Sequence, residues 1–291
     1  MWKTLIGNDT EFLNSIKGYL NKNFSMKDLG EAAYILGIKI YRDRSRRLIV
    51  LSQSTYLDNV LKKFKMDQAK KGFLLVLQGV KLSQTQCPTT AEDREKMKVI
   101  PYASAIGSIM YAMLYTILDV CLAISLAGRY QSNPRVDHWT AVKNILKYLK
   151  MTKDMFLVYG GDKELIVNGY IDASFDTDPD DSKSQTGYIF LLNGGVEFIS
   201  DLGVIPSASG PMKIFCDNTG AIALEKESRF HKRTKHIKRR FNSIHGQVKE
   251  GDIEICKIHT DLNVADPLTK PLSRAKHDHH QDSMGVRIIT V

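Results

Sequence analysis

Cysteine is scarce in this 291-residue chain, and its four cysteines, Cys87, Cys121, Cys216 and Cys256, are far apart. None belongs to a Cys-x-x-Cys pair, so the sequence predicts neither a zinc knuckle nor a disulfide framework. The first residues, MWKTLIGNDTEF, lack the long apolar run of a signal peptide. These absences favour a reducing, intracellular setting, cytoplasmic or nuclear, and no secretion.

Long apolar runs are also scarce. The exception extends from Val99 to Leu118, which has no charged residue and about the length of a transmembrane helix. It contains Pro101 and several Ser, Gly and Tyr residues, and Asp119 follows it directly. We therefore expect two packed core helices here and no membrane span.

What the chain does have is an excess of positive charge, with a formal net charge of +9. Such a balance favours a polyanionic partner, although lysine-rich surfaces also serve solubility. The hydrophobic share of 43% and the charged share of 25% are those of an ordinary folded protein. The length suggests about two domains, and nothing in the composition indicates an oligomeric state.

The first half of the chain has mainly helical periodicity, and the second half begins with short apolar runs typical of strands. Antiparallel strands followed by alternating strands and helices predict a mixed sheet in an α/β layer fold. We place the main boundary near 152–162. The expected elements are a helix capped by Asp9, a hairpin in AAYILGIKIYRDRSRRLIVLS, a helix from Ser52 or Ser54, a less regular connection with an extended piece over 67–98, helices near 101–114, 119–131 and 135–150, strands in MFLVYG, LIVNGYIDASF, TGYIFLLNGG, VEFIS and MKIFCDN, a helix from Thr219, a basic helix near 234–250, a strand in IEICKIHT and a last helix from Val264.

Three aspartates stand at unusual places. Asp172 interrupts an apolar strand, Asp217 ends one, and Asp266 follows another. If strands 168–175 and 213–217 are neighbours, about 4.8 Å apart, their carboxylates can share a metal ion. Clustered aspartates suit Mg²⁺ and phosphoryl chemistry. In the alternative reading, Asp217 and Asp266 each cap a helix and Asp172 is a strand-edge residue.

A basic run, RFHKRTKHIKRR, follows the second aspartate and contains no acid. Such a density of cations suits contacts to nucleic-acid phosphates. A solvated helix face or a nuclear-localisation-like patch is the alternative. Its candidate phosphate-binding residues are Arg229, Lys232, Arg233, Lys235, Lys238, Arg239 and Arg240.

A histidine-rich cluster lies near the C-terminus. His277, Asp278, His279 and His280 have no partner ligands at suitable spacing, so we expect them to be solvated.

Several longer motifs resemble a known family. GYIDASF, DDSKSQTGYIFLLNGG, IFCDNTGAIAL, RFHKRTKHIKRR and NVADPLTKPL resemble the ribonuclease H region of copia-type long-terminal-repeat retrotransposon Pol polyproteins. Upstream, FSMKDLGEAAYILGIKIYR, LSQSTYLDNVLKKFKM, PYASAIGSIMY and HWTAVKNILKYLK resemble the end of the reverse transcriptase of the same polyproteins. The resemblance covers nearly the whole chain, in order, which makes it far more specific than a single motif.

The resemblance implies a fold and a function. Residues 156–291 would form a ribonuclease H-like mixed sheet, and residues 1–155 the palm end, thumb and connection of a reverse transcriptase, mainly helical with one β-hairpin. Asp172, Asp217 and Asp266 would be three of the four carboxylates that hold two Mg²⁺ ions and cut the RNA strand of an RNA–DNA hybrid. Leu36-Gly37 would lie in the primer-grip hairpin.

The sequence departs from this family at the fourth carboxylate. The family carries that glutamate on the first helix of the ribonuclease H fold, but here GGVEFIS continues directly into DLGVIPSASG. The helix is missing at Ser200–Asp201, and Glu197 is a substitute that we expect to point elsewhere. We therefore expect impaired or absent cleavage and a weakened, partly ordered C-terminal domain. A non-catalytic nucleic-acid-binding remnant, a decayed element without function and a mis-joined gene model are the alternatives.

The polymerase part departs further. The family's Tyr-x-Asp-Asp motif stands directly before the IGND stretch, where this chain has only MWKTL. We therefore expect no nucleotide addition. Ile117-Leu118 also replaces an Arg-Pro pair that the family has before the aspartate at position 119.

Overall fold

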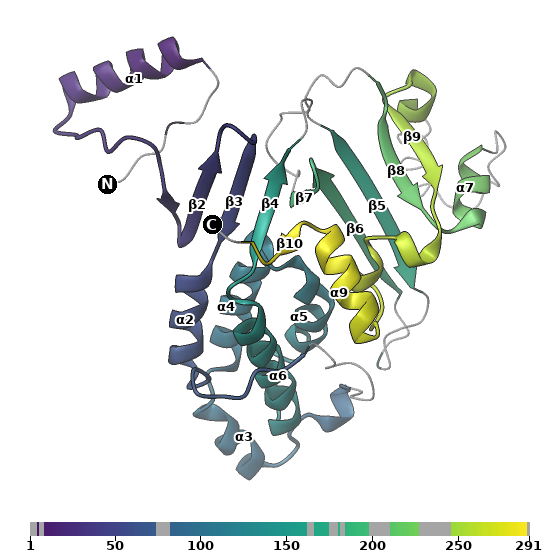
Figure 1. The fold of residues 1–291 in the computed structure, drawn as a ribbon. Helices are drawn as coiled ribbons and strands as arrows, with labels where there is room; N and C mark the ends of the chain where they lie inside the picture. Colours follow the sequence, from purple (N-terminus) through teal and green to yellow (C-terminus); the bar gives the residue numbers. More distant parts are fainter. Residues whose placement is uncertain are drawn as a thin grey trace.

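The computed structural model describes residues 5, 9–73, 82–161, 166–174, 180, 184–197, 210–226 and 246–289, with backbone alone for 196–197 and 224–226. In this part of the chain, a group of helices lies beside two β-sheets (Figure 1). The expected mixed α/β architecture is confirmed.

The first sheet is antiparallel throughout and has the order β1-β2-β3-β4-β10. Its core is the expected hairpin of β2 and β3. Leu36 and Gly37 form the tight turn before β2, both at positive φ, a conformation that glycine adopts without strain. The strands are β1 (Tyr34–Ile35), β2 (Ile38–Asp43), β3 (Leu48–Ser52), β4 (Phe156–Gly160) and β10 (Val286–Arg287).

Strand β4 joins the two halves of the chain. The sequence assigns MFLVYG to the C-terminal domain, yet β4 pairs with β3 of the hairpin, and β10 from the C-terminal end pairs with β4. The first sheet therefore contains strands from both sides of the expected boundary. The division into 1–155 and 156–291 stays a prediction.

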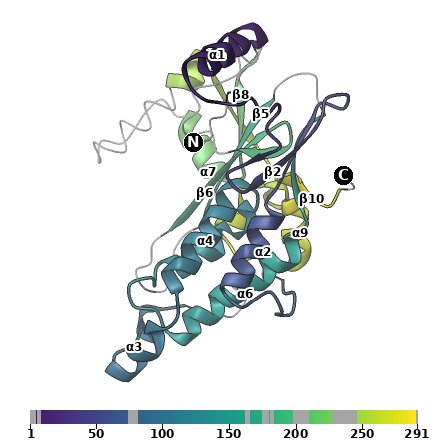
Figure 2. The same cartoon turned by 90° about the vertical axis from the view of Figure 1, so that its left-hand side faces the viewer.

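A helical bundle packs below this sheet and buries the largest hydrophobic core of the described residues (Figures 1 and 2). The three helices expected between 101 and 150 are confirmed. Helix α3 is an addition within the expected connection, and Thr90 accepts a hydrogen bond from the Asp93 amide at its N-terminus, as caps do. The bundle comprises α2 (Ser54–Lys63), α3 (Ala91–Lys98), α4 (Tyr102–Tyr115), α5 (Cys121–Gly128) and α6 (Val136–Thr152).

The uncharged stretch that imitates a membrane span is largely α4. No single described helix is both long and apolar enough to cross a membrane, and α3 and α4 meet that criterion only as a pair bent by 50°. One face of α4, with Ile106 and Ile109, is buried in the core of the bundle. The structure therefore agrees with packing in a core, but this stretch forms one core helix where two were expected, and the next helix, α5, begins after it.

Helix α1 (Thr10–Asn23) begins as expected, because Asp9 accepts a hydrogen bond from the Phe12 amide at 2.9 Å. It has no buried residue, and Phe12 and Tyr19 are both exposed. Figure 1 shows α1 standing apart from the bundle and from both sheets. Its apolar periodicity therefore forms a helix without forming a core.

The second sheet is mixed and has the order β7-β6-β5-β8-β9. Strands β5, β6 and β7 pair antiparallel, whereas β8 pairs parallel with both β5 and β9. Helix α7 (Thr219–Lys226) follows β8 at the expected position. The strands are β5 (Val167–Ser174), β6 (Gln185–Leu192), β7 (Gly195–Glu197), β8 (Met212–Cys216) and β9 (Ile253–Lys257).

The prediction that the last helix begins at Val264 is wrong. A single 3₁₀ turn, η5 (Asp266–Leu268), comes first, and α9 begins only at Arg274 and ends at Ser283. Pro267 supplies no backbone N–H, and Pro271 disfavours the helical region for the residue before it. The two prolines therefore delay the helix.

The histidine cluster on α9 is solvated only in part, which corrects the expectation. Asp278 and His279 are exposed, but His280 is buried and His277 is mostly covered. Positions 277, 280 and 281 lie on one face of the helix because the α-helix repeats every 3.6 residues. That face packs towards Asp119 and Tyr148 of the bundle.

Two expected features fall outside the described residues. They are the seven cations of the basic run and the junction at 200–201. Of the basic helix expected near 234–250, the structure describes residues 246–250, which are helical.

Candidate metal centre

The register of two parallel strands brings Asp172 and Asp217 together. The last pair in the β5–β8 ladder is Ile171 with Cys216. Asp172 is the next residue of β5, and Asp217 directly follows the last residue of β8. The expectation that these two strands are neighbours is confirmed. Because paired strands lie about 4.8 Å apart, the two backbones hold the carboxylates side by side.

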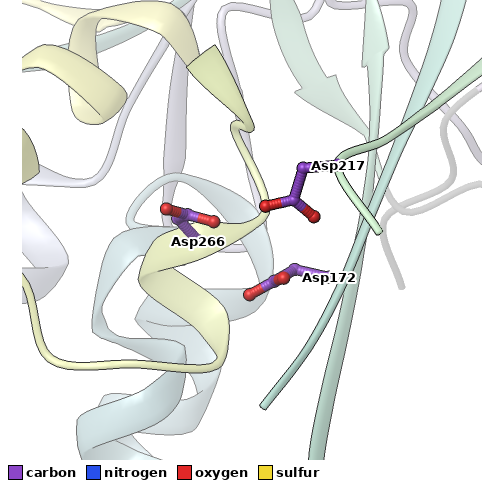
Figure 3. Close-up of side chains that lie close together, drawn as sticks. All are labelled: Asp172, Asp217 and Asp266. Carbon is purple, nitrogen blue, oxygen red and sulfur yellow. The ribbon is translucent and has the colours of Figure 1, made fainter. Parts of the chain in front are cut away.

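Asp266 completes the cluster from the turn η5, which follows β9. One carboxylate oxygen from each of the three aspartates lies within 4.8 Å of the others. Figure 3 shows the three side chains converging on a common space, Asp172 from within β5, Asp217 from the residue after β8 and Asp266 from the turn η5. Asp266 is 3% exposed and Asp172 8%, whereas Asp217 is half-buried.

The close approach of this turn to the sheet depends on Gly187. Gly187 pairs with Asp172 across β5 and β6. A Cβ atom there would lie 2.7 Å from Leu268 Cβ and 2.9 Å from Thr269 Cγ2. The missing side chain therefore leaves the space in which the segment after Asp266 packs.

Hydrogen bonds from the same segment fix two of the carboxylates. Asn263 donates from Nδ2 to Asp217 Oδ1 at 3.3 Å and to the backbone oxygen of Ile171 at 3.0 Å. The hydroxyl of Thr269 donates to Asp172 Oδ2. Asn263 and Thr269 are almost fully buried, so these bonds are shielded from competition with water.

The three carboxylates of the cluster lie close enough to repel one another when they are ionised, and Lys270 is the cation beside them. Burial and, to a lesser extent, the neighbouring carboxylates of Asp172 and Asp217 together raise the pKa of Asp266 to about 6, against the lowering effect of Lys270. Lys270 Nζ lies 2.9 Å from Asp266 Oδ1 and 3.8 Å from Asp172 Oδ2. Burial alone would lower the pKa of Lys270, but the hydrogen bond to Asp266 and the carboxylate charges raise it.

The donor set fits a hard divalent cation. All three side chains offer carboxylate oxygens, the ligands that Mg²⁺ prefers, and like charges held this close are stabilised by a cation between them. Asp172, Asp217 and Asp266 are therefore the residues that could hold such an ion. Soft ligands take no part in this cluster, so zinc is a poorer match.

The expected substitute for the fourth carboxylate, Glu197, belongs to β7. Strand β6 separates β7 from β5, and Phe190 of β6 pairs with both Glu197 and Gly169. Glu197 is therefore two strands across and three residues along from Asp172, which puts the two backbones about 14 Å apart. The side chain of Glu197 is not among the described parts of the chain.

Sequence reasoning missed four residues around the cluster, namely Gly187, Asn263, Thr269 and Lys270. Three of them belong to the motif NVADPLTKPL that also contains Asp266. Their positions three before, three after and four after this aspartate are the available signal, because a tight turn brings such residues to one side. Gly187 had no signal beyond being a glycine in a strand, which often marks a close backbone approach.

Fold and site together define an α/β protein with an oxygen-only candidate metal centre at the end of a mixed sheet. A family model described as reverse transcriptase (RNA-dependent DNA polymerase) matches residues 3–76. No solved structure matches the chain.

Three similar curated proteins are plant transposon products. The retrovirus-related Pol polyprotein from transposon TNT 1-94 of Nicotiana tabacum is 36% identical over 97% of this chain and 24% of its own length. Those from transposons RE2 and RE1 of Arabidopsis thaliana are 30% and 28% identical, each over 97% of this chain and 21% of their own length. The chain belongs to the retrovirus-related Pol polyprotein family of copia-type transposons. It spans about a quarter of the length of these relatives.

Proposed function

We propose that this chain is a Pol fragment of ribonuclease H lineage, built for Mg²⁺-dependent cleavage of the RNA strand in RNA–DNA hybrids and impaired or inactive in that reaction. The observation that carries the proposal is the convergence of Asp172, Asp217 and Asp266 at the ends of adjacent elements. The mixed sheet, antiparallel over β7-β6-β5 and parallel over β5-β8-β9, supports it because the family resemblance implies a sheet of this kind.

In this proposal the three aspartates bind the metal ion, and neighbouring residues orient their carboxylates. When bound, Mg²⁺ would activate water and stabilise charge on the phosphodiester oxygens. Asn263 and Thr269 hold Asp217 and Asp172 in place through the hydrogen bonds described above. Asp266 has a pKa of about 6, so at neutral pH it is mostly ionised and able to bind a cation.

The impairment follows from the missing fourth carboxylate. The alignment with the TNT 1-94 polyprotein extends over 316 residues, whereas 97% of this 291-residue chain is about 282, so the relative has about 34 residues without a counterpart here. A difference of this size supports the loss of a helix near 200–201. Losing even an indirect partner of a metal typically costs 10–100-fold in affinity or activity, and this loss removes a direct ligand.

A non-catalytic role in nucleic-acid binding is the second candidate. The net charge of +9 favours it, because phosphate contacts need cations and no intact catalytic set. The seven basic residues at 229–240 are the proposed contacts. Neither candidate includes nucleotide addition, because these 291 residues contain no Tyr-x-Asp-Asp motif. An intracellular location, cytoplasmic or nuclear, is part of the proposal, supported by four free thiols.

The test is cleavage of an end-labelled RNA–DNA hybrid by the purified chain with Mg²⁺. Asp172→Asn removes a ligand charge. Asp261→Asn is the matched control, because Asp261 is exposed and pairs with Lys276 outside the cluster. Binding of the same hybrid is measured in parallel across a salt series.

The outcomes distinguish a residual nuclease, a nucleic-acid-binding remnant and a product without either activity. Cleavage that Asp172→Asn abolishes and Asp261→Asn retains would show that three aspartates suffice for residual activity. Salt-dependent binding without cleavage, unchanged or improved in Asp172→Asn, would establish the binding remnant. Neither cleavage nor binding would refute both candidates and leave a decayed product without function.

A further inference from the structure

A lysine sits beside the carboxylates where a cation is needed. Lys270 Nζ lies 2.9 Å from Asp266 Oδ1 and 3.8 Å from Asp172 Oδ2, so one ammonium group contacts two of the three candidate ligands. It comes from the same segment as Asp266, four residues further along. The contact with Asp266 therefore lies within one segment, whereas the contact with Asp172 depends on the packing of this segment against β5.

The charge balance explains why such a contact is favourable. Three aspartates within 4.8 Å of one another repel when all are ionised, and two of them are buried. One ammonium group offsets part of that repulsion while no divalent ion is bound. A divalent ion offsets more of it and seeks the same oxygens.

The lysine can leave without disturbing the aspartates. Its backbone amide donates to the Asp266 carbonyl at 3.1 Å, as does the amide of Thr269, so the turn is fixed by its own backbone. The Lys270 side chain is 34% exposed, in contrast to the nearly buried Asp266 side chain. Rotation about its flexible four-carbon stem can carry Nζ to solvent.

We propose that Lys270 is an internal cation that occupies the carboxylate cluster in the metal-free protein and competes with the divalent ion for it, so that Lys270 sets the metal affinity of the site. This inference rests on the proposed function, because it assumes that the three aspartates hold a metal. The proposal is distinguished by the direction in which the metal affinity changes when Lys270 is replaced. Removing a competing cation tightens metal binding, whereas removing a residue that merely supports the site weakens it.

The experiment is a titration of the full-length chain with Mn²⁺, followed by the paramagnetic resonance signal of the unbound ion. The variants are Lys270→Met, which removes the charge, and Lys270→Arg, which keeps it. Lys276→Met is the matched control, because Lys276 also pairs with an aspartate, Asp261, outside the cluster. Asp172→Asn tests whether the Mn²⁺ that binds is held by the carboxylate cluster, because the variant should lose that binding.

We expect Lys270→Met to lower the Kd for Mn²⁺ roughly 5- to 10-fold, the size expected for a partly exposed ion pair removed from competition. Lys270→Arg and Lys276→Met should stay within about twofold of the unchanged chain. A second readout is the melting temperature. Lys270→Met should melt lower than the unchanged chain in a chelator and gain more from added Mn²⁺, since binding to the folded state stabilises it.

The failures are distinguishable. If Asp172→Asn abolishes Mn²⁺ binding but Lys270→Met binds equally or more weakly than the unchanged chain, the competition by Lys270 is refuted and the metal centre stands. If no form binds Mn²⁺ in a way that depends on Asp172, the metal centre itself is refuted, and the role of Lys270 with it.

Discussion

Asn263 donates a hydrogen bond from Nδ2 to Oδ1 of Asp217 at 3.3 Å, although 46 residues separate the two in the chain. The same amide group donates to the carbonyl of Ile171, the residue before Asp172, and Asn263 Oδ1 accepts from the amide of Ala265, the residue before Asp266. One fully buried side chain therefore touches the surroundings of all three aspartates.

Replacing Asn263 with alanine should destabilise the chain and loosen the cluster. The change leaves the buried amide of Ala265 and the partly buried carbonyl of Ile171 without these hydrogen bonds, which costs about 2–3 kcal/mol in the free energy of unfolding. Urea denaturation measures this loss. The control is Asn23→Ala, since the Asn23 side chain donates to the Tyr19 carbonyl on the exposed helix α1 and its loss should change stability by less than about 0.5 kcal/mol. Equal effects of the two variants would contradict the positioning role of Asn263.

Gly187→Ala should destabilise the chain through a clash and not through backbone entropy. The new Cβ would meet Leu268 and Thr269 at under 3.0 Å, and such overpacking costs about 1–3 kcal/mol. Gly107→Ala in helix α4 is the opposite case, because nothing lies within 4 Å of its Cβ position and alanine favours helices by about 0.5–1 kcal/mol. Thermal melting of both variants checks the contrast. A melting temperature of Gly187→Ala at or above that of the unchanged chain would show that η5 does not pack as described.

Tyr148→Phe should weaken the attachment of α9 to the helical bundle. The Tyr148 hydroxyl donates to the buried carboxylate of Asp119, and Gln281 of α9 donates to both. Burial and the Asp119 charge raise the pKa of Tyr148 well above its ordinary value, so the hydroxyl stays protonated and remains a donor.

The stability lost in Tyr148→Phe can be compared with that lost when a tyrosine hydrogen bond to a neutral acceptor is removed. Tyr102 is also buried, and its hydroxyl donates to the carbonyl of Ala127 at 2.8 Å. Hydrogen bonds to charged groups are roughly twice as strong as neutral ones, so Tyr148→Phe should cost about 2–3 kcal/mol and Tyr102→Phe about 1 kcal/mol. Urea unfolding of the two variants gives the comparison. A larger loss of unfolding free energy in Tyr102→Phe than in Tyr148→Phe would contradict the expected contribution of the Tyr148 hydrogen bonds with Asp119 and Gln281.

His280 should make the chain less stable in mild acid. Burial and, to a lesser extent, the positive charges of His279, His277, Lys270 and Lys276 together lower its pKa to about 4. Neither ring nitrogen has a hydrogen-bond partner within the described residues. The folded state therefore keeps His280 neutral, whereas the unfolded chain takes up a proton below its ordinary pKa of about 6.5.

The sign of the pH dependence follows. Stability attributable to His280 is intact above pH 6.5 and falls as the pH drops towards 4, by about 2 kcal/mol at pH 5. Urea unfolding at pH 7 and pH 5 should show this loss in the unchanged chain and a smaller loss in His280→Leu. His259→Leu is the control, because the His259 side chain is exposed. An unchanged pH dependence in His280→Leu would mean that another group carries the acid sensitivity.

Local pattern was enough to predict most elements and the three aspartates. Apolar spacing indicated α4, α5 and α6, and the acid in the middle of VNGYIDASF marked Asp172 as unusual. The delayed start of α9 could have been read from Pro267 and Pro271, since proline acts on its immediate neighbours. These features depend on residues close in sequence, so the sequence by itself determined them.

Only the tertiary structure decided which distant segments meet. The pairing of β4 with β3, the contacts of Gln281 with Asp119 and Tyr148, and the contacts of Asn263 and Lys270 with the aspartates join residues whose closeness no local periodicity encodes. Strand pairing is set by long-range packing, and a side chain's charge environment is set by whatever the fold places beside it. For this protein the sequence determined the three candidate ligands, and the tertiary structure decided the strand register, the space left by Gly187 and the lysine that surround them.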